Sequence, residues 1–208
     1  MLTAKHNFLI YPFFQKYAGW IINRHFGTVQ IIGHLNKKEL PILLISNHIS
    51  WWDGFWGMYV NSNVLHRKFH FMMLEEQLQK YWLLRYTGGF SVNKKSKSMV
   101  DTLNYSAKLL HDRQNMLLIF PQGEIQSLHN QTFHFEKGVE RIVKDKQNAV
   151  QIVFMANLID YFSNRKPGIF IHLQEYESNA FDINSIQESY NLFYARSVER
   201  QKNSTGNK

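Results

Sequence analysis

Short apolar runs alternate along the chain with segments whose apolar residues recur at helical spacing. Strands are predicted over residues 28–34, 41–46, 68–73, 116–120, 150–156 and 168–173. Helices are predicted over residues 51–60, 75–86, 99–112, 136–144 and 183–199. The run 116–120 is apolar throughout and is followed by a proline, which is typical of a central strand buried on both faces. The alternation predicts an α/β layered fold with a mainly parallel sheet flanked by helices.

Residues 8–26 precede the first predicted strand and are amphipathic and rich in aromatic residues. Their aromatic and basic positions include Phe8, Phe13, Tyr17, Trp20, Lys16 and Arg24. Such a segment is either an interfacial helix, with its apolar face in the headgroup boundary of a membrane, or a helix packed on the core. We interpret residues 1–27 as an amphipathic membrane-surface segment and 28–200 as one domain. The polar residues 201–208 are predicted to be a disordered tail.

The composition favours an anionic partner and, in particular, a membrane surface. Twenty-four Lys and Arg against sixteen Asp and Glu give a formal charge of +8, which suits lipid headgroups, nucleic acid or a phosphorylated cofactor. Aromatic residues make up 15% of the chain, and Trp and Tyr favour surfaces that are apolar on one side and wet on the other. They gather in the N-terminal segment and after residue 48, so no nucleic-acid partner is expected. We expect peripheral association with the cytoplasmic face of a membrane, because no apolar run is long enough to span one and no signal-peptide pattern begins the chain.

The residue types present exclude several classes of chemistry. The chain contains no cysteine, which excludes disulfides, thiolate metal sites and a cysteine nucleophile. No Gly-x-Ser-x-Gly elbow supports a serine hydrolase, and no Gly-rich phosphate loop supports a nucleotide enzyme. His66 and His70 are four residues apart, but a third ligand is not suitably placed, so no metal site is expected. Catalysis would therefore depend on histidine, carboxylates or hydroxyls.

A histidine and a carboxylate follow the predicted strand at 41–46. His48 lies on a short polar elbow where this strand reaches the surface, and Asp53 lies in the first turn of the next helix. If the elbow folds back, the carboxylate meets the imidazole, fixes its tautomer and stabilises its charged form. A structural alternative remains, because Ser50 and Asp53 also have the spacing of a helix capping box.

A second motif, Phe120-Pro121-Gln122-Gly123-Glu124, follows the strand at 116–120. The carboxyl ends of parallel strands share one edge of a sheet, so this motif and His48 are expected to face one crevice. Asn47-His48-x4-Asp53 and the second motif together resemble the glycerolipid acyltransferase family, of the lysophosphatidic acid acyltransferase type. Residues 89–94 resemble that family's second block, and 135–138 resemble the element after its third block. The resemblance covers about residues 41–156.

The resemblance implies transfer of a fatty acyl group from acyl-CoA or acyl carrier protein to a hydroxyl, often of a lysophospholipid, in phospholipid biosynthesis. It implies that His48 is the general base and that Asp53 orients and polarises it. The substrate-binding residues that it implies are Asn47, Lys94, Gln122, Gly123, Glu124 and Lys137, with Lys94 placed to hold a phosphate. The acyl thioester is a substrate, and no bound cofactor is expected. Backbone amides at the start of the helix after Ser50 are candidate donors to the developing oxyanion.

The third block departs from the family pattern, Phe-Pro-Glu-Gly-Thr-Arg. Gln122 replaces the glutamate, Glu124 takes the place of the threonine, and Ile125 takes the place of the arginine. An isoleucine cannot clamp a phosphate as a guanidinium does, which weakens the case for a phosphate-bearing acceptor. Either the lysines at 94, 95 and 97 bind a phosphate, or Gln122 and Glu124 bind the hydroxyls of a glycosylated or neutral acceptor. The alternative function is that of a non-catalytic membrane-surface lipid-binding protein on the same fold. The presence of both His48 and Asp53 argues against this alternative.

Overall fold

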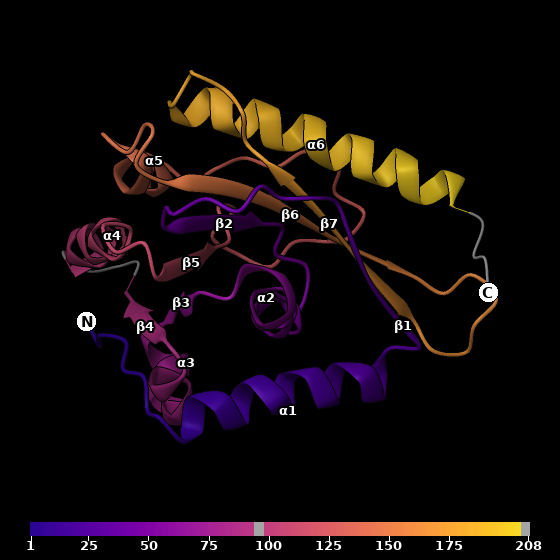
Figure 1. The fold of residues 1–208 in the computed structure, drawn as a ribbon, viewed down its shortest axis with the longest axis horizontal. Coiled ribbons are helices and arrows are strands. Elements are labelled where there is room, and N and C mark those ends of the chain that lie inside the picture. Colours follow the sequence, from indigo (N-terminus) through magenta and orange to yellow (C-terminus); the bar gives the residue numbers. More distant parts are fainter. Residues whose placement is uncertain (94–97, 205–208) are drawn as a thin grey trace.

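The computed structural model describes residues 1–93 and 98–204 of the 208-residue chain. Seven strands of this part form one sheet in the order β1-β7-β6-β2-β5-β3-β4 (Figure 1). Their bounds are β1 (Thr28–Ile32), β2 (Ile42–Ser46), β3 (Lys68–Leu74), β4 (Gly89–Val92), β5 (Asn115–Ile119), β6 (Gln151–Asp160) and β7 (Gly168–Glu175). Strands β6 and β7 pair antiparallel, and the other neighbours pair parallel. The predicted α/β fold with a mainly parallel sheet is confirmed.

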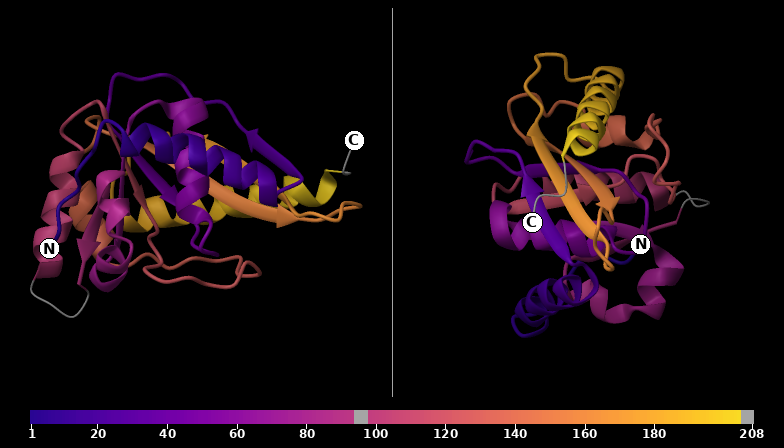
Figure 2. Two further views of the ribbon diagram at one scale, coloured as in Figure 1. Left: turned by 90° about the horizontal axis from the view of Figure 1, so that it is seen from below. Right: turned by 90° about the vertical axis from the view of Figure 1, so that its right-hand side faces the viewer.

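Helices cover both faces of this sheet, with α1 and α6 on opposite sides of the molecule (Figures 1 and 2). Their bounds are α1 (Ile10–His25), α2 (Asp53–Val60), α3 (Glu75–Lys80), α4 (Ser98–Leu109), α5 (Gly138–Val143) and α6 (Ile183–Asn203). Alternate residues of β2 serve the two faces: Ile42 and Leu44 pack in the layer with α1 and α2, and Leu43 and Ile45 pack in the layer with α4, α5 and α6. Strands β2 and β5 are therefore buried along their whole length.

The helix predicted over residues 75–86 is broken. α3 covers its first part, and a 3₁₀ turn, η2 (Trp82–Tyr86), covers its second. The backbone N–H and the hydroxyl of Thr87 both donate hydrogen bonds to the Leu84 carbonyl, at 3.2 and 2.9 Å, and close this turn. The same carbonyl lies so near Gly89 that a Cβ there would approach it to 2.8 Å. Helical spacing could not indicate this break, because the contacts that stabilise η2 come from residues after it.

Two other elements, α6 and β6, extend beyond the ends predicted for them. α6 runs to Asn203, so residues 201–203, predicted to be in the disordered tail, are helical, and Gln201 is buried. Residues 205–208 of that tail lie outside the described part of the chain. β6 extends to Asp160 because residues 157–160 pair through the backbone with the start of β7. A polar residue interrupts the apolar pattern before each of these boundaries, whereas backbone pairing and amide burial do not require apolar side chains.

His6 docks the segment before α1 onto β3, where its ring meets that of His70. A ring nitrogen of His6 donates to the Phe69 carbonyl at 2.8 Å, and Nδ1 of His70 donates to the Lys68 carbonyl at 3.0 Å. The two rings lie edge to face with centroids 4.8 Å apart. Burial lowers the pKa of His6, and burial with the neighbouring His6 lowers the pKa of His70 to about 4. Both rings are therefore neutral in the folded protein at neutral pH.

The histidine pair predicts acid sensitivity. Because the pKa of His70 in the folded protein lies below the ordinary histidine value of 6.5, its contribution to stability is complete above pH 6.5 and is lost as the pH falls toward 4. We expect His70 to account for about 2 to 3 kcal/mol of the fall in unfolding free energy over this range, measured by urea denaturation. The variant His70→Asn should flatten this fall, and an unchanged pH dependence in the variant would contradict the assignment.

Candidate active site

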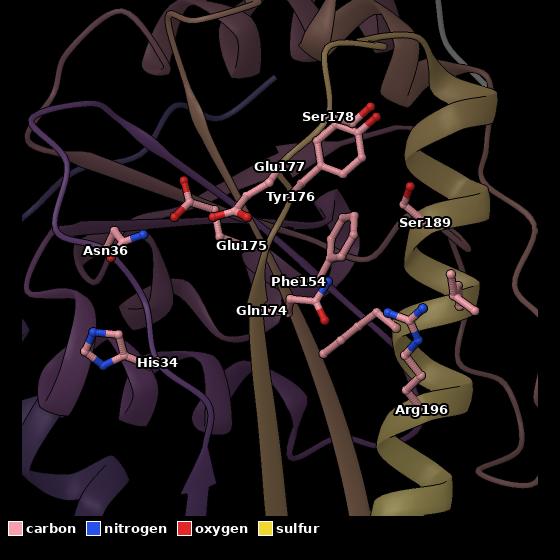
Figure 3. A pocket seen from close by; sticks show the side chains of 12 residues that line it. His34, Asn36, Phe154, Gln174, Glu175, Tyr176, Glu177, Ser178, Ser189 and Arg196 are labelled. Atoms are coloured by element: carbon pink, nitrogen blue, oxygen red, sulfur yellow. The ribbon is translucent and has the colours of Figure 1, made fainter.

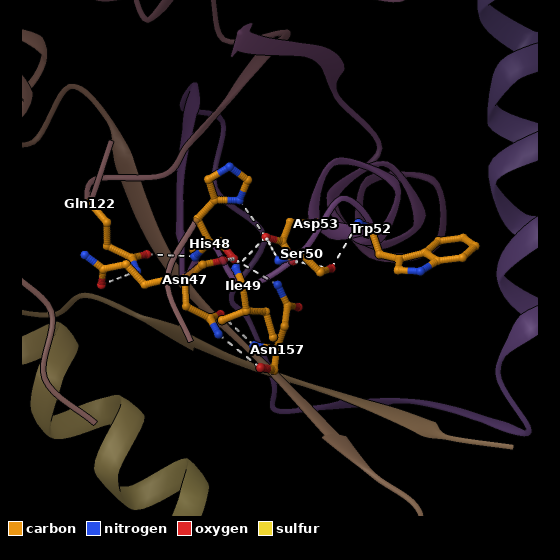
Figure 4. A network of polar contacts seen from close by, with 10 residues as sticks. Asn47, His48, Ile49, Ser50, Trp52, Asp53, Gln122 and Asn157 are labelled. Carbon is orange, nitrogen blue, oxygen red and sulfur yellow. Dashed lines mark hydrogen bonds and ion pairs between the residues drawn. The ribbon is translucent and has the colours of Figure 1, made fainter. Parts of the chain in front are cut away.

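The elbow after β2 folds back so that His48 meets Asp53. Nδ1 of His48 lies 2.6 Å from Oδ2 of Asp53 (Figure 4). A carboxylate can only accept a hydrogen bond, so Nδ1 carries the proton, and the neutral ring has its lone pair on Nε2. The His48 side chain is 24% exposed, and Nε2 has no hydrogen-bond partner within the described part of the chain. The arrangement presents a proton acceptor to the surface.

Asp53 is fully buried and surrounded by donors. Its Oδ2 accepts hydrogen bonds from the backbone N–H groups of Ile49 and Ser50, at 2.7 and 3.0 Å, and Oδ1 accepts from the Ser50 hydroxyl at 3.3 Å. These donors offset the cost of removing a carboxylate from water. The bond from Ser50 N–H is half of a capping box, but the Ser50 hydroxyl accepts from Trp52 N–H instead of from Asp53. Asp53 thus both shapes the elbow and holds the imidazole.

Three backbone amides around the elbow are already engaged. The N–H groups of Ile49 and Ser50 donate to Asp53, and that of Trp52 donates to the Ser50 hydroxyl. The role in binding an oxyanion that is expected of the amides at the start of the helix after Ser50 stays a prediction.

Asn47, for which substrate binding is predicted, anchors the end of β2 through its side chain. Its side chain is buried, with Nδ2 donating to the Asn157 carbonyl at 3.0 Å and Oδ1 accepting from Asn157 N–H at 2.8 Å (Figure 4). The paired register of β2 and β6 ends one residue earlier, at Ser46 and Met155. The Asn47 amide therefore continues the β2–β6 pairing and fixes the backbone directly before His48. Sequence reasoning missed Asn157, although a polar residue directly after the apolar run at 150–156 was a signal for it.

Gln122 joins the two motifs by bonds within the protein. Its Oε1 accepts from His48 N–H at 2.7 Å, and its Nε2 donates to Oε1 of Gln126 at 2.9 Å. Gln126 N–H in turn donates to the His48 carbonyl at 2.9 Å. The motifs meet because β2 and β5 are neighbours in the sheet. The Gln122 side chain is buried with both polar ends engaged and braces the elbow, and its predicted contact with substrate stays a prediction.

The ring of Phe120 stacks on that of His48. The ring centroids lie 4.2 Å apart and the planes differ by 12°. This contact holds the plane of the imidazole in place. The second motif contains Phe120, but a stacking role could not be read from the sequence, since it depends on the orientation of both rings.

The remaining predicted residues lie nearer the surface. Gly123 has a positive φ of 72°, which glycine adopts without strain in the turn after Pro121. Glu124 is exposed one residue further, and Ile125, in the place of the family's arginine, is 56% exposed. Lys137 is exposed just before α5. Lys94 lies outside the described residues.

Two pockets flank α6. One of about 470 Å³ is lined by the end of β7 and by Arg196 (Figure 3). Because β7 is antiparallel to β6, that pocket lies beside the first residues of β6, away from His48. A hollow of about 260 Å³ is lined by Asn157, by residues 128–131 of the loop that follows Gln122, and by α6. This second hollow lies beside the hydrogen-bond network around His48, because Asn157 lines the hollow and also bonds to Asn47.

The family model described as Acyltransferase matches residues 28–159. The matched span contains His48, Asp53 and Gln122. No curated protein matches the chain significantly.

The brace formed by Gln122 predicts a measurable loss of stability. The variant Gln122→Met leaves the His48 N–H without its acceptor. We therefore expect the free energy of unfolding, measured in urea, to fall by about 1 to 3 kcal/mol. Gln122→Glu keeps an acceptor for that N–H and should lose less. The control is Gln131→Met in the same loop, where the residue is exposed. Equal unfolding free energies for Gln122→Met and the control would contradict the bracing role.

Proposed function

The chain belongs to the acyltransferase family, and from that membership we propose that it moves a fatty acyl group from acyl-CoA or acyl carrier protein to a hydroxyl of a lysophospholipid or related lipid. The observation that carries this proposal is the imidazole of His48, held at Nδ1 by a buried carboxylate with Nε2 unpartnered in the described chain. Such a group accepts a proton from an approaching hydroxyl.

In the proposed reaction, His48 Nε2 takes the proton of the acceptor hydroxyl while that oxygen attacks the thioester carbonyl. Asp53 stabilises the imidazolium that forms. The tetrahedral intermediate then expels the thiolate, which receives the proton back from His48, and the ester remains on the acceptor. No acyl-enzyme is formed. Proton transfer contributes about 10²–10⁴-fold in rate, and the rest comes from holding the two substrates in line.

The third block bears on the choice of acceptor. Gln122 is turned into the protein and Ile125 presents an apolar side chain to solvent, so neither supplies the phosphate clamp of the family pattern. A 1-acylglycerol-3-phosphate acceptor would then depend on Lys94 and its neighbouring lysines. A glycosylated or neutral lipid acceptor would instead use exposed polar groups such as Glu124, and the exposed Ile125 favours this second acceptor.

We also propose that the protein lies on a membrane surface through α1, at the cytoplasmic face, where the proposed acyl donors occur. One side of α1 packs into the core through Ala18 and Ile22. The other side exposes Phe13 and Trp20, which are 69% and 58% accessible. The first face fits the core interpretation of this segment, and the exposed aromatic side chains of the second face support the proposed membrane contact. No helix of the described residues is long and apolar enough to cross a bilayer.

Release of free thiol from acyl-CoA tests the proposed reaction. With a panel of acceptors that includes a lysophosphatidate and a glycosylated lipid, the wild-type protein should release thiol with at least one of them. His48→Ala should lower the rate about 10²–10⁴-fold, because the proton acceptor is lost. Asp53→Asn should also lower the rate of thiol release, since an amide neither fixes the tautomer of His48 nor stabilises the imidazolium.

The matched control for this assay is His111→Ala, which removes an exposed histidine just after α4. Its rate should equal that of the wild type. Unchanged thiol release in His48→Ala would exclude His48 from the mechanism. Vesicle binding without thiol release for any acceptor would instead favour the non-catalytic lipid-binding alternative.

Sedimentation with anionic vesicles tests the role of α1. The double variant Phe13→Ser with Trp20→Ser should bind at least about tenfold more weakly, because two aromatic side chains no longer enter the headgroup boundary. Leu192→Ser, an exposed position on α6 at the opposite side of the molecule, is the control and should bind as the wild type does. Equal binding of all three proteins would show that α1 does not contact lipid.

A further inference from the structure

Three consecutive large side chains are exposed in the turn Tyr81–Leu83, where α3 ends and η2 begins. Tyr81, Trp82 and Leu83 are 47%, 59% and 48% accessible. Single exposed apolar residues are common on protein surfaces, but a contiguous group that includes a tryptophan indicates an interaction surface. These residues contribute nothing to the His48 network, and so their exposure requires another explanation.

This turn adjoins the start of α1. The N–H groups of Lys5 and Asn7 donate hydrogen bonds to the Arg85 and Tyr86 carbonyls, at 2.9 and 3.1 Å, and so fix the segment before α1 against η2. The Trp82 ring contacts that of Tyr86, with centroids 6.0 Å apart. Two further exposed apolar side chains, Phe8 and Leu9, follow directly after Asn7. Two views place α3 beside the amino end of α1, on the side opposite α6 (Figures 1 and 2).

From this geometry we infer that the turn Tyr81–Leu83 is a second membrane-contacting element, which joins the exposed face of α1 in one lipid-binding surface. The inference rests on the proposed membrane association and extends it to a segment outside the N-terminal helix. The occupant is a bilayer that contains anionic lipid.

The charges beside the aromatic rings support a bilayer as the occupant. Nζ of Lys80 lies 5.4 Å from the centroid of the Tyr81 ring, and the Arg24 guanidinium lies 5.7 Å from that of Trp20. Such pairs suit the membrane interface, where the ring enters the headgroup boundary and the cation meets phosphate. They lie near opposite ends of α1, whose 16 residues span about 24 Å. Contact at both ends would fix the tilt of the protein on the bilayer.

This orientation brings lipid toward the candidate active site. Trp51, three residues after His48, is exposed, and its ring lies 4.7 Å from that of Phe55. Phe55 in turn contacts Phe14 and Tyr17 of α1. Aromatic contacts thus connect α1 to the elbow that carries His48. A lipid acceptor in the bilayer would approach His48 along this surface.

The double variant Trp82→Ser with Leu83→Ser tests the inference. In sedimentation with vesicles of phosphatidylcholine and about one-third phosphatidylglycerol, we expect it to bind at least about fivefold more weakly than the wild type while its melting temperature is unchanged. The matched control is Val100→Ser with Leu192→Ser, two exposed positions on α4 and α6, and should bind as the wild type does. Wild-type binding by the turn variant would overturn the inference.

A milder variant keeps the test independent of folding. Brominated lipids quench the fluorescence of tryptophans that enter the bilayer, so Trp82→Phe should lose part of the quenching that the wild type shows. Unchanged quenching would place Trp82 outside the bilayer and overturn the inference. If the α1 variant binds weakly and the turn variant binds normally, only the role of the turn fails. If the wild type does not bind the vesicles, the proposed membrane association fails with it, while thiol release in detergent micelles still tests acyl transfer.

Discussion

A single buried carboxylate, that of Asp53, determines the shape of the site. Its oxygens gather the ring nitrogen of His48, the N–H groups of Ile49 and Ser50, and the Ser50 hydroxyl. An ionised carboxylate out of water is costly unless donors surround it, so folding of Asp53 into the core forces the preceding residues into the elbow. The same bonds set the backbone that carries His48 and the tautomer of its ring. Structure and proposed chemistry therefore depend on one charge.

Neighbouring strands hold this elbow from the outside. The Asn47 amide continues the pairing of β2 with β6, and Gln122, on the loop after β5, accepts from His48 N–H. Phe120, at the end of the same strand, covers one face of the His48 ring. Because β6, β2 and β5 are consecutive in the sheet, their carboxyl ends deliver these groups to one place. The position of His48 thus follows from sheet order and from few side-chain bonds.

The sequence predicted the fold class, the meeting of His48 with Asp53 and the meeting of the two motifs, because each follows from apolar periodicity or from strand direction. It did not predict that Asn47 and Gln122 turn inward. An amide pairs with whichever backbone groups adjacent strands leave free, and that depends on register. Periodicity also could not separate the two interpretations of α1, since one amphipathic pattern serves a core face and an exposed aromatic face. Lys94 lies outside the described residues, so its predicted phosphate contact stays a prediction.

The most direct test of the central claim is the protonation of the His48 ring itself. Nitrogen-15 NMR of labelled protein at about pH 8, with the His48 signals assigned by their absence in His48→Ala, distinguishes a protonated ring nitrogen from one with a lone pair. We expect a proton on Nδ1, facing Asp53, and a lone pair on Nε2. A neutral ring with its proton on Nε2 would contradict it, because that tautomer cannot donate to the carboxylate or accept a proton from a hydroxyl at the exposed nitrogen.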